Sequence, residues 1–380
     1  SRRGRSRSYR ASGSEEIARI IERNLSPKGL FKQTIPVEEK HIDALIKLAK
    51  TQKDTMLRVL VKKTDTIREH LSVRNDDLFK LFITLFMELF EDRYDNKHVM
   101  ILRPIVVKSL TERLNRVHEP EYLIYLLETL KTIFETGVEI SDFVQNDGIE
   151  MIVANTWSIV NHEVATPPTA KYNEVAKTAL SALHTFLRAV LSKHLNESLK
   201  SVEAWEDADM STVDNQVNLV KQKFIECNVI THLLMYVFEN DEMFEEALEI
   251  LRGLWSKAET HEIVANNIES LVKKLETGKY TREKVSILNM FAKTETPTRM
   301  TIAIQPLVEL FNEIPISRNV DDERDFLTKL ITDTLLLLWP HTKDESKTII
   351  ARALSSSRAK FKIKQIMTSF KTFAKLTENL

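Results

Sequence analysis

The stretch FIECNVITHLLMYVF, residues 224–238, decides the fold together with the two stretches that follow it, EEALEILRGLWSKA (245–258) and HEIVANNIESLVKKLETG (261–278). Each carries apolar residues three and four positions apart, which places them on one face of a helix. The segment FVQNDGIEMIVANTWSIV, residues 143–160, has the same order as the first stretch: a short helix, a polar break and a longer apolar helix. The sequence therefore predicts consecutive amphipathic helices that pack against one another.

The rest of the chain agrees with an all-α fold. Residues 78–90, LFKLFITLFMELF, are apolar on nearly every side and predict a buried helix. No segment shows sustained alternation of apolar and polar residues bounded by hairpin turns, so we expect no β-sheet. The prolines fall mainly where helices should begin or end, among them Pro104, Pro120 and Pro306.

Length and charge favour an elongated molecule without a general affinity for polyanions. A single core stops growing at about 250–300 residues, whereas a stack of repeats has no such limit, and this chain has 380 residues. The 54 lysines and arginines nearly balance the 55 aspartates and glutamates. This balance gives no overall attraction to nucleic acid or to anionic membranes.

The order of these helices resembles armadillo repeats, which combine a short helix, a second helix and a third helix of the type E-A-L-x-x-L-x-N-L. Residues 246–254 match that third helix, residues 261–278 open the next unit, and residues 285–292 supply its third helix. The resemblance is strongest at 143–160 and 224–292. It implies a right-handed α-solenoid of armadillo/HEAT-like repeats, and a helical repeat of another family stays open as the alternative.

The spacing of one equivalent position supports repeats of this size. The candidates for the consensus asparagine of the third helix are Met87, Thr132, Thr185, Gly253 and Met290. Their spacings are 45, 53, 68 and 37 residues, against about 40–47 residues for armadillo and HEAT units. The two long gaps coincide with a proline-rich linker near 165–170 and an acidic insertion at 197–214.

The repeat domain is expected to cover residues 15–357, between two basic ends. Residues 1–14 alternate arginine with serine and glycine and cannot bury enough surface to become ordered, so we expect a disordered tail. Ser6 and Ser8 follow arginines at the spacing that basophilic kinases favour, which makes them candidate phosphorylation sites. Residues 358–380 predict a basic amphipathic helix that caps the last repeat.

The motifs of common enzymes are missing from the sequence. The seven glycines are too far apart to form a phosphate-binding glycine loop. The ten histidines show no HxxxH or HExxH spacing, and no GxSxG nucleophile motif occurs. The single cysteine, Cys227, lies beside Glu226, which disfavours a thiolate, and we expect it to be a small buried filler. We therefore expect no catalysis, no metal ion and no cofactor.

The third helices of armadillo solenoids line the concave face, so the resemblance implies which side chains face a partner. The ten candidates are Glu128, Thr132, Ser181, Thr185, Arg188, Glu249, Ser256, Ser286, Met290 and Lys293. Most are small or polar, as in a groove that accepts an extended peptide or a partner helix. The recurrent asparagine and tryptophan of importin-like members are missing at these positions, which argues against binding of nuclear-localisation peptides.

The resemblance implies a non-enzymatic scaffold or adaptor that binds proteins along this face. Two alternatives stay open. One is a regulatory subunit or exchange-factor-like solenoid that clamps an enzyme, a chaperone or a small GTPase. The other is an RNA-associated helical-repeat protein, for which the arginine- and serine-rich tail is the only support.

Nucleic acid and membranes are not the expected partners. No stretch of about 18 apolar residues occurs, and the basic C-terminal helix is the only hint of membrane contact. A single cysteine allows no disulfide framework within the chain. We therefore expect a reducing compartment, the cytoplasm and with it the nucleus.

Overall fold

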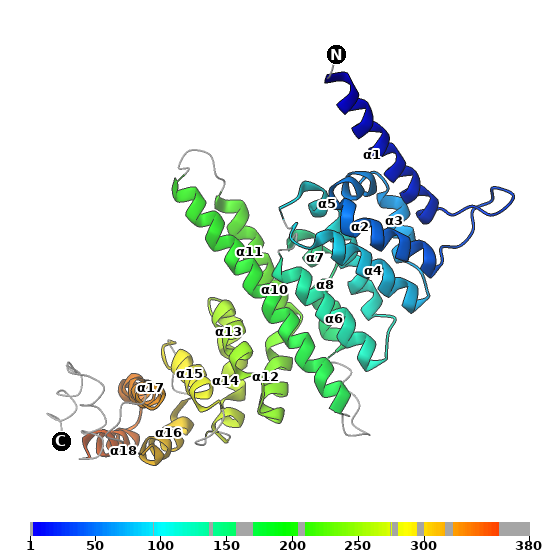
Figure 1. Ribbon diagram of the computed structural model, residues 1–380. Helices are drawn as coiled ribbons and strands as arrows, with labels where there is room; N and C mark the ends of the chain where they lie inside the picture. The colour runs from blue at the N-terminus through cyan, green and yellow to red at the C-terminus, as the bar shows by residue number, and fades with distance from the viewer. Residues whose placement is uncertain are drawn as a thin grey trace. The chain divides into compact units, whose positions relative to one another are not determined.

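The structure is a computed structural model that describes residues 3–93, 95–136, 140–156, 170–203, 210–273, 275, 280–294, 300–315 and 322–356. These residues are mainly helical and form no strand, which confirms the all-α class (Figure 1). An isolated β-bridge joins Lys28 to Thr34. The chain divides into two compact units, residues 1–216 (unit 1) and 217–380 (unit 2), and each is described by itself.

Unit 1 holds the helices of the N-terminal half, and α11 contains the boundary. The helices are α1 (Arg3–Leu25), α2 (Glu39–Leu60), α3 (Thr64–Leu71), α4 (Asp76–Phe90), α5 (Lys97–Leu114), α6 (Pro120–Glu135), α7 (Ile140–Gln145), α8 (Gly148–Asn155), α10 (Ala170–Glu203) and α11 (Met210–Glu226). Helix α2 packs against α1 and α4, α6 packs against α10, and α5 contacts both α3 and α8. Neighbours in space are thus mostly helices one or two places apart in the sequence.

Helix α4 is buried on most sides, as its sequence predicted. Its first turn is capped by Asn75, whose side chain accepts a hydrogen bond from the backbone N–H of Leu78 at 3.0 Å. The buried residues are Phe79, Phe82, Ile83, Leu85, Phe86, Leu89 and Phe90. Because they cover more than one face, α4 can pack against α2 on one side and α5 on another.

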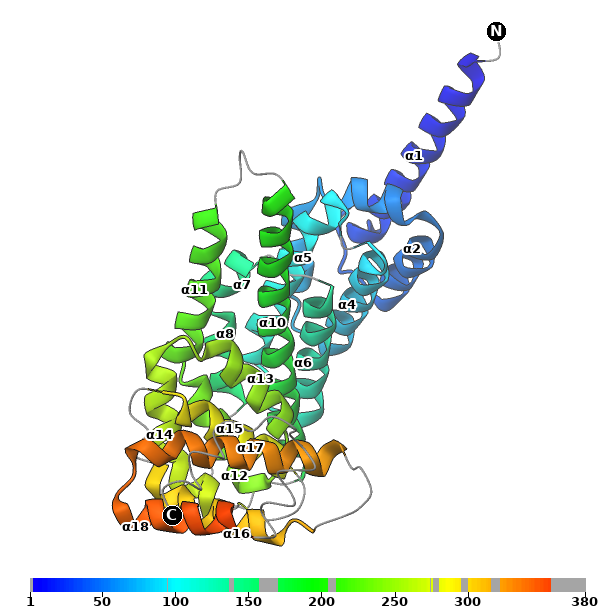
Figure 2. The ribbon, with the colours of Figure 1, turned by 90° about the vertical axis from the view of Figure 1, so that its left-hand side faces the viewer.

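Unit 2 repeats a pair of helices. Its helices are α12 (Val229–Asn240), α13 (Phe244–Leu254), α14 (Ala258–Lys273), α15 (Thr281–Ala292), α16 (Thr301–Glu313), α17 (Asp322–Leu338), the 3₁₀ helix η2 (Trp339–His341) and α18 (Asp344–Ser355). Helix α14 contacts α12 and α16, and α16 contacts α18; in the same way α15 contacts α13 and α17 (Figure 2). The helices α14, α16 and α18 begin at Ala258, Thr301 and Asp344, each 43 residues after the one before.

The two breaks that the sequence predicted have the same backbone geometry. Asp147, before α8, has φ 56° and ψ 33°, and Asn228, before α12, has φ 57° and ψ 31°. Aspartate and asparagine tolerate this left-handed conformation better than other residues with a side chain. Met243 and Tyr280, which precede α13 and α15, are also left-handed. Equivalent positions along the chain thus fold alike, which is compatible with a helical repeat.

Two of the prolines that were expected at helix ends lie inside helices. Pro120 begins α6 as predicted, but Pro104 lies within α5 and Pro306 within α16. A proline inside a helix frees the carbonyl four residues before it. Those carbonyls belong to Met100 and Ile302, which are 44% and 47% exposed. Each proline thus follows, by one turn, an exposed residue of its own helix.

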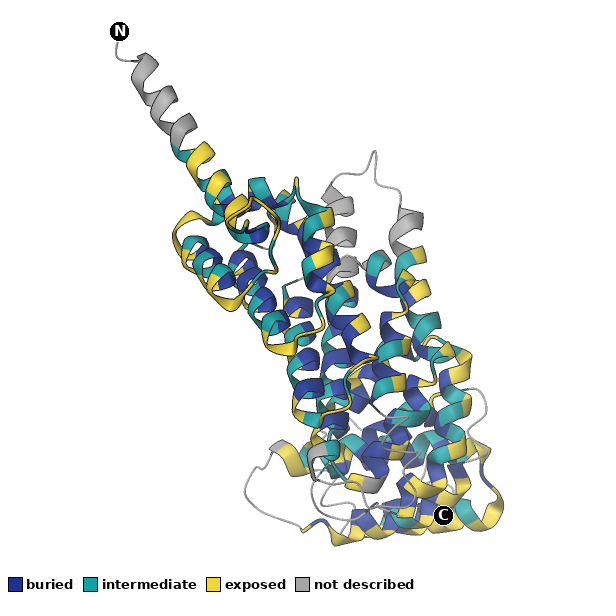
Figure 3. Cartoon of the chain, turned by 90° about the vertical axis from the view of Figure 1, so that its right-hand side faces the viewer, coloured by how far each residue is buried: buried dark blue, intermediate teal, exposed yellow. Residues whose placement is uncertain are grey.

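Three phenylalanines form the centre of the core of unit 1. Phe134 of α6, Phe143 of α7 and Phe186 of α10 are buried, with ring centroids 4.7–5.1 Å apart. Gly148 begins α8 directly beside them, and a Cβ atom at this position would lie 2.1 Å from the ring of Phe143. A glycine is therefore required where α8 meets this cluster. The buried positions concentrate on the inward sides of the helices (Figure 3).

Helix α1 begins at Arg3, so its backbone includes most of the residues 1–14 for which a disordered tail was expected. The C-terminal part of α1 packs against α2, and Ile21 and Leu25 are buried. Once one end of a helix is fixed, each further residue adds a hydrogen bond without a new nucleation step, and arginine and alanine are good helix formers.

The other expected segments are described only in part. The backbone of residues 197–203 continues α10, and that of 210–214 belongs to α11, so the acidic insertion lies partly within two helices. The rest of this insertion, most of the linker near 165–170 and nearly all of the expected repeat-capping helix at 358–380 lie outside the described residues.

Candidate functional site

A groove of about 670 Å³ lies between α4 and α6 in unit 1. We call it the α4–α6 groove. Its lining residues are Ile83, Thr84, Met87, Glu88, Phe90, Glu91, Asp92, Tyr125, Glu128, Thr129, Thr132, Ile133 and Thr136. Residues three and four positions apart share a helix face. The groove therefore uses one face of the C-terminal part of α4 and one face of α6.

The floor of the groove is apolar. Ile83, Phe90 and Ile133 are buried, while Met87 and Tyr125 are half-buried and reach the surface. An unbranched thioether adapts its shape to what packs against it, and an aromatic ring offers a large contact area. The floor thus offers apolar surface that a bound side chain could cover.

The four threonines that line the groove have hydroxyl groups that already donate hydrogen bonds within their own helices. The hydroxyl group of each donates to a backbone carbonyl of its own helix at 2.8–3.0 Å: Thr84 to Lys80, Thr129 to Tyr125, Thr132 to Glu128 and Thr136 to Ile133. The hydroxyl hydrogen is therefore already used, and the methyl group remains as a contact surface. This is why a groove with four threonines still behaves as an apolar one.

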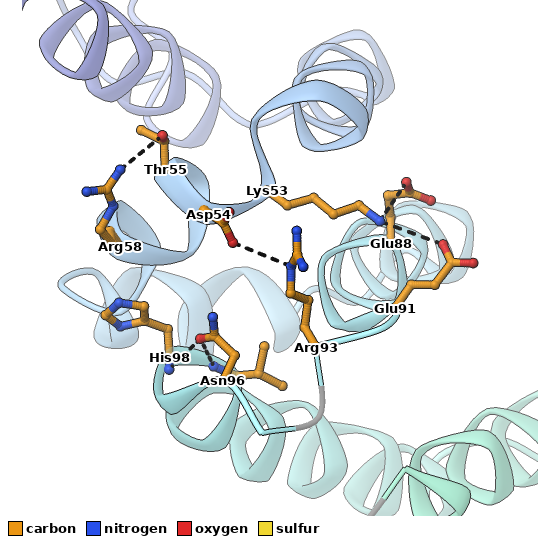
Figure 4. Close-up of polar contacts among 10 residues, drawn as sticks. Lys53, Asp54, Thr55, Arg58, Glu88, Glu91, Arg93, Asn96 and His98 are labelled. Carbon is orange, nitrogen blue, oxygen red and sulfur yellow. Dashed lines mark hydrogen bonds and ion pairs between the residues drawn. The ribbon is translucent and has the colours of Figure 1, made fainter. Parts of the chain in front are cut away.

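The rim of the groove is acidic. Among the described lining residues there are four carboxylates and no basic side chain; the carboxylates belong to Glu88, Glu91, Asp92 and Glu128. Lys53 of α2 lies just outside, with its Nζ 3.5 Å from a carboxylate oxygen of Glu88 and 3.8 Å from one of Glu91 (Figure 4). A second lysine, Lys80, lies with its Nζ 5.2 Å from the ring centroid of Tyr125. The four carboxylates outnumber these two lysines, which leaves a negative potential over the opening.

Kinked backbone and a capped turn hold this rim in place. The helical geometry of α2 is interrupted at Gln52, and the next two residues, Lys53 and Asp54, both reach toward the end of α4 (Figure 4). Asp54 lies 3.4 Å from Nε of Arg93, in the turn that follows α4. That turn ends at Asn96, whose side chain accepts hydrogen bonds from the first N–H groups of α5. Two neighbouring residues of α2 thus hold the end of α4: Lys53 pairs with the rim acids Glu88 and Glu91, and Asp54 pairs with the turn that follows.

The phenol of Tyr125 should make the stability of unit 1 depend on pH in the alkaline range. Burial raises the pKa of Tyr125 to about 12, while a tyrosine of the unfolded chain titrates near pH 10. The folded state holds the proton more tightly, so the stabilisation is complete below about pH 10 and is lost as the pH rises toward 12. We expect Tyr125→Phe to lose less stability over this range than the wild type does.

Urea unfolding at stepwise pH values measures this effect. The two proteins are compared first at about pH 8, where the phenol is protonated in both states. Equal slopes of the unfolding midpoint against pH between about 10 and 12 for wild type and variant would contradict the prediction.

The structure brings together two of the ten predicted site residues in the α4–α6 groove. Glu128 and Thr132 are exposed and line it. Three others lie on α10, which packs against α6: Arg188 is exposed, and Ser181 and Thr185 are half-buried.

The remaining five predicted residues belong to unit 2. Glu249, Ser256 and Lys293 are exposed, and the hydroxyl of Ser256 lies 3.2 Å from Nζ of Lys221. Met290 is half-buried. Ser286 is only 5% exposed, and its hydroxyl donates to the carbonyl of Arg282 in its own helix. The groove-lining acids Glu88, Glu91 and Asp92 were not predicted, although they follow the register position Met87 by only one to five residues.

The sequence also singled out two serines as candidate phosphorylation sites and the single cysteine as a buried residue. The backbone of Ser6 and Ser8 belongs to α1. Cys227 follows α11 and is half-buried rather than fully buried. No group of three or more metal-ligating side chains occurs in the described ranges. No helix among the residues that the structure describes is long and apolar enough to cross a bilayer.

Comparison with models of known protein families and with curated protein sequences found no match.

Proposed function

We propose that this chain is a protein-binding α-solenoid of the armadillo/HEAT type, a scaffold or adaptor without catalytic activity. In this proposal the α4–α6 groove binds a segment of a partner protein that combines apolar and basic side chains. The observation that carries the proposal is the joining of an apolar floor and an acidic rim in one groove.

The packing pattern supports the repeat type. In unit 2 the helices contact those two places away along two separate series, α12–α14–α16–α18 and α13–α15–α17. Such a pattern is typical of stacked helical pairs in which each repeat contacts its neighbours. The spacing of 43 residues between the starts of α14, α16 and α18 lies within the range of about 40–47 residues for armadillo and HEAT units.

The apolar floor and the acidic rim of the groove favour an amphipathic helix with basic side chains as the bound segment. An amphipathic helix binds by laying its apolar face into an apolar groove between helices. Met87 and Tyr125 would contact that face, because both reach the surface of the floor. The carboxylates of Glu91 and Glu128 would attract lysines or arginines beside it, which raises the association rate and selects against acidic segments.

Fluorescence anisotropy with a labelled amphipathic helix of leucine and lysine tests the proposal. We expect saturable binding to the full chain, and about tenfold or greater weakening for the double variant Glu128→Lys/Thr132→Arg. Both side chains are exposed, so the variant should fold. It reverses one rim charge and places a long side chain in the groove. A second probe, with glutamate in place of every lysine, should bind far more weakly.

A matched charge reversal outside the groove provides the control. Asp43 of α2 and Glu69 of α3 are exposed and do not line the groove. The variant Asp43→Lys/Glu69→Lys changes the net charge by even more than the groove variant does, and it should bind the probe as the wild type does. If both variants lost affinity alike, the binding would reflect net charge alone and the groove assignment would be wrong.

A further inference from the structure

The connection between α1 and α2 presents two large apolar side chains to solvent. Leu30 is 99% exposed and Phe31 is 89% exposed, more than any other large apolar residue in the described part of the chain. The loop between α1 and α2 projects away from both helices (Figure 1). Leu30 and Phe31 form its turn, which the N–H of Lys32 closes by donating to the carbonyl of Gly29. A leucine and a phenylalanine side by side in water form an unfavourable surface, which is typical of a site that another molecule covers.

The loop is a small hairpin with a fixed shape. The N–H of Gly29 donates to the carbonyl of Gln33 at 2.8 Å, and the N–H of Ile35 donates to the carbonyl of Pro27 at 2.8 Å. The N–H of Phe31 donates to the side chain of Gln33 at 3.0 Å. Pro27 is buried at the base of the loop. The tip is therefore held in one conformation before it meets a partner, which lowers the entropic cost of binding.

Two lysines flank the apolar tip. Lys28 and Lys32 lie on either side of Leu30 and Phe31, and both are exposed. Lys32 has φ 61°, a left-handed conformation that turns the chain back after the tip. We call Lys28–Lys32 the basic tip. It offers a convex apolar surface between two positive charges.

We infer that the basic tip of one copy of this chain binds in the α4–α6 groove of a second copy. The two surfaces are complementary: the groove is concave and apolar with four carboxylates at its rim, and the tip is convex and apolar with two flanking lysines. Leu30 and Phe31 would cover Met87 and Tyr125, while the lysines would face Glu91 and Glu128. This inference rests on the proposed function, because it uses the same groove as a peptide-binding site.

The arrangement predicts open-ended, weak self-association. Tip and groove are different surfaces of unit 1, so each copy that uses its tip still has a free groove. Such head-to-tail contacts form chains unless the rotation happens to close a ring. A contact made by two apolar side chains and their flanking lysines is much smaller than a standard stable interface. Association should therefore appear only as the protein concentration rises.

Sedimentation velocity of the full chain over a range of concentrations tests the inference. We expect the weight-average sedimentation coefficient of the wild type to rise with concentration. The tip variant Leu30→Ser/Phe31→Ser and the groove variant Glu128→Lys/Thr132→Arg should each stay monomeric. The control variant Asp43→Lys/Glu69→Lys should associate as the wild type does.

A mixture of the two monomeric variants provides the decisive result. The groove variant keeps an intact tip and the tip variant keeps an intact groove, so together they can form one contact and no more. We expect the mixture to form a dimer that does not grow further. A monomeric wild type at every concentration would overturn the inference, and so would a mixture that remains monomeric.

The failure of this inference can be told apart from the failure of the proposed function. If the wild type binds the leucine–lysine probe in the groove and yet stays monomeric, the groove assignment holds and the tip has no role in self-association. If the wild type neither binds the probe nor associates, both are wrong. The tip variant should bind the probe with unchanged affinity, since Leu30 and Phe31 do not line the groove.

Discussion

Replacing Phe186 by alanine is expected to lower the free energy of unfolding of unit 1 by about 3–5 kcal/mol. The ring of Phe186 is completely buried, and its centroid lies 5.1 Å from that of Phe134 and 4.7 Å from that of Phe143. Truncation would remove one of three mutually packed rings and leave a cavity where α6, α7 and α10 meet. The surrounding helices hold their positions through other contacts, so the cavity should not collapse fully.

Hydrogen exchange at increasing urea concentration measures this loss, because peptides from α6 and α10 report on unit 1 separately from unit 2. Phe186→Leu retains most of the volume and should cost less than about 1.5 kcal/mol. An equal and small cost for both variants would mean that these three rings do not pack as the structure has them.

Replacing Arg113 by methionine is expected to cost about 3 kcal/mol, by removal of charge-assisted hydrogen bonds inside unit 1. The side chain is only 5% exposed. Its guanidinium group donates to the carbonyls of Val73 and Arg74, to a carboxylate oxygen of Asp76 at 2.9 Å and to the hydroxyl of Tyr122 at 3.3 Å. It also stacks 4.1 Å from the ring centroid of Phe79. One side chain thus joins the end of α5 to the beginnings of α4 and α6.

Methionine fills much of the same volume, so the measured loss reports mainly the hydrogen bonds. We expect a loss of unfolding free energy near the lower end of the range for a broken buried ion pair. Asp76 is 61% exposed, so its carboxylate regains water when its partner is removed. Arg116→Met, at an exposed position three residues away, should change the unfolding free energy by less than about 0.5 kcal/mol. Similar losses for the two variants in urea unfolding would contradict the role given to Arg113.

The helices could be predicted from the sequence because helical periodicity is a local property. The breaks at Asp147 and Asn228 were visible for the same reason, since a short polar residue tolerates a left-handed backbone. The extent of α1 was not predicted, because the composition of residues 1–14 says nothing about the fixed helix that follows them.

The candidate site could be predicted only in part, because it depends on how helices rotate against each other. Ser286 was expected on an exposed face, but α15 packs against α17 with Asn289 hydrogen-bonded to Thr334 at 3.0 Å, and this rotation buries Ser286. Glu128 and Thr132, which the repeat register placed on the concave face, line the α4–α6 groove. That α4 and α6 leave a groove between them, with Glu91 at its rim, depends on packing that no single helix sequence encodes.

Hydrogen exchange of the full chain with and without the leucine–lysine probe shows which helices the probe covers, and so tests whether it binds in the α4–α6 groove. Binding in this groove predicts slower exchange in the C-terminal part of α4 and in α6, with the helices of unit 2 unchanged. Protection confined to α13 and α15, or a probe that binds without slowing exchange in α4 or α6, would contradict it.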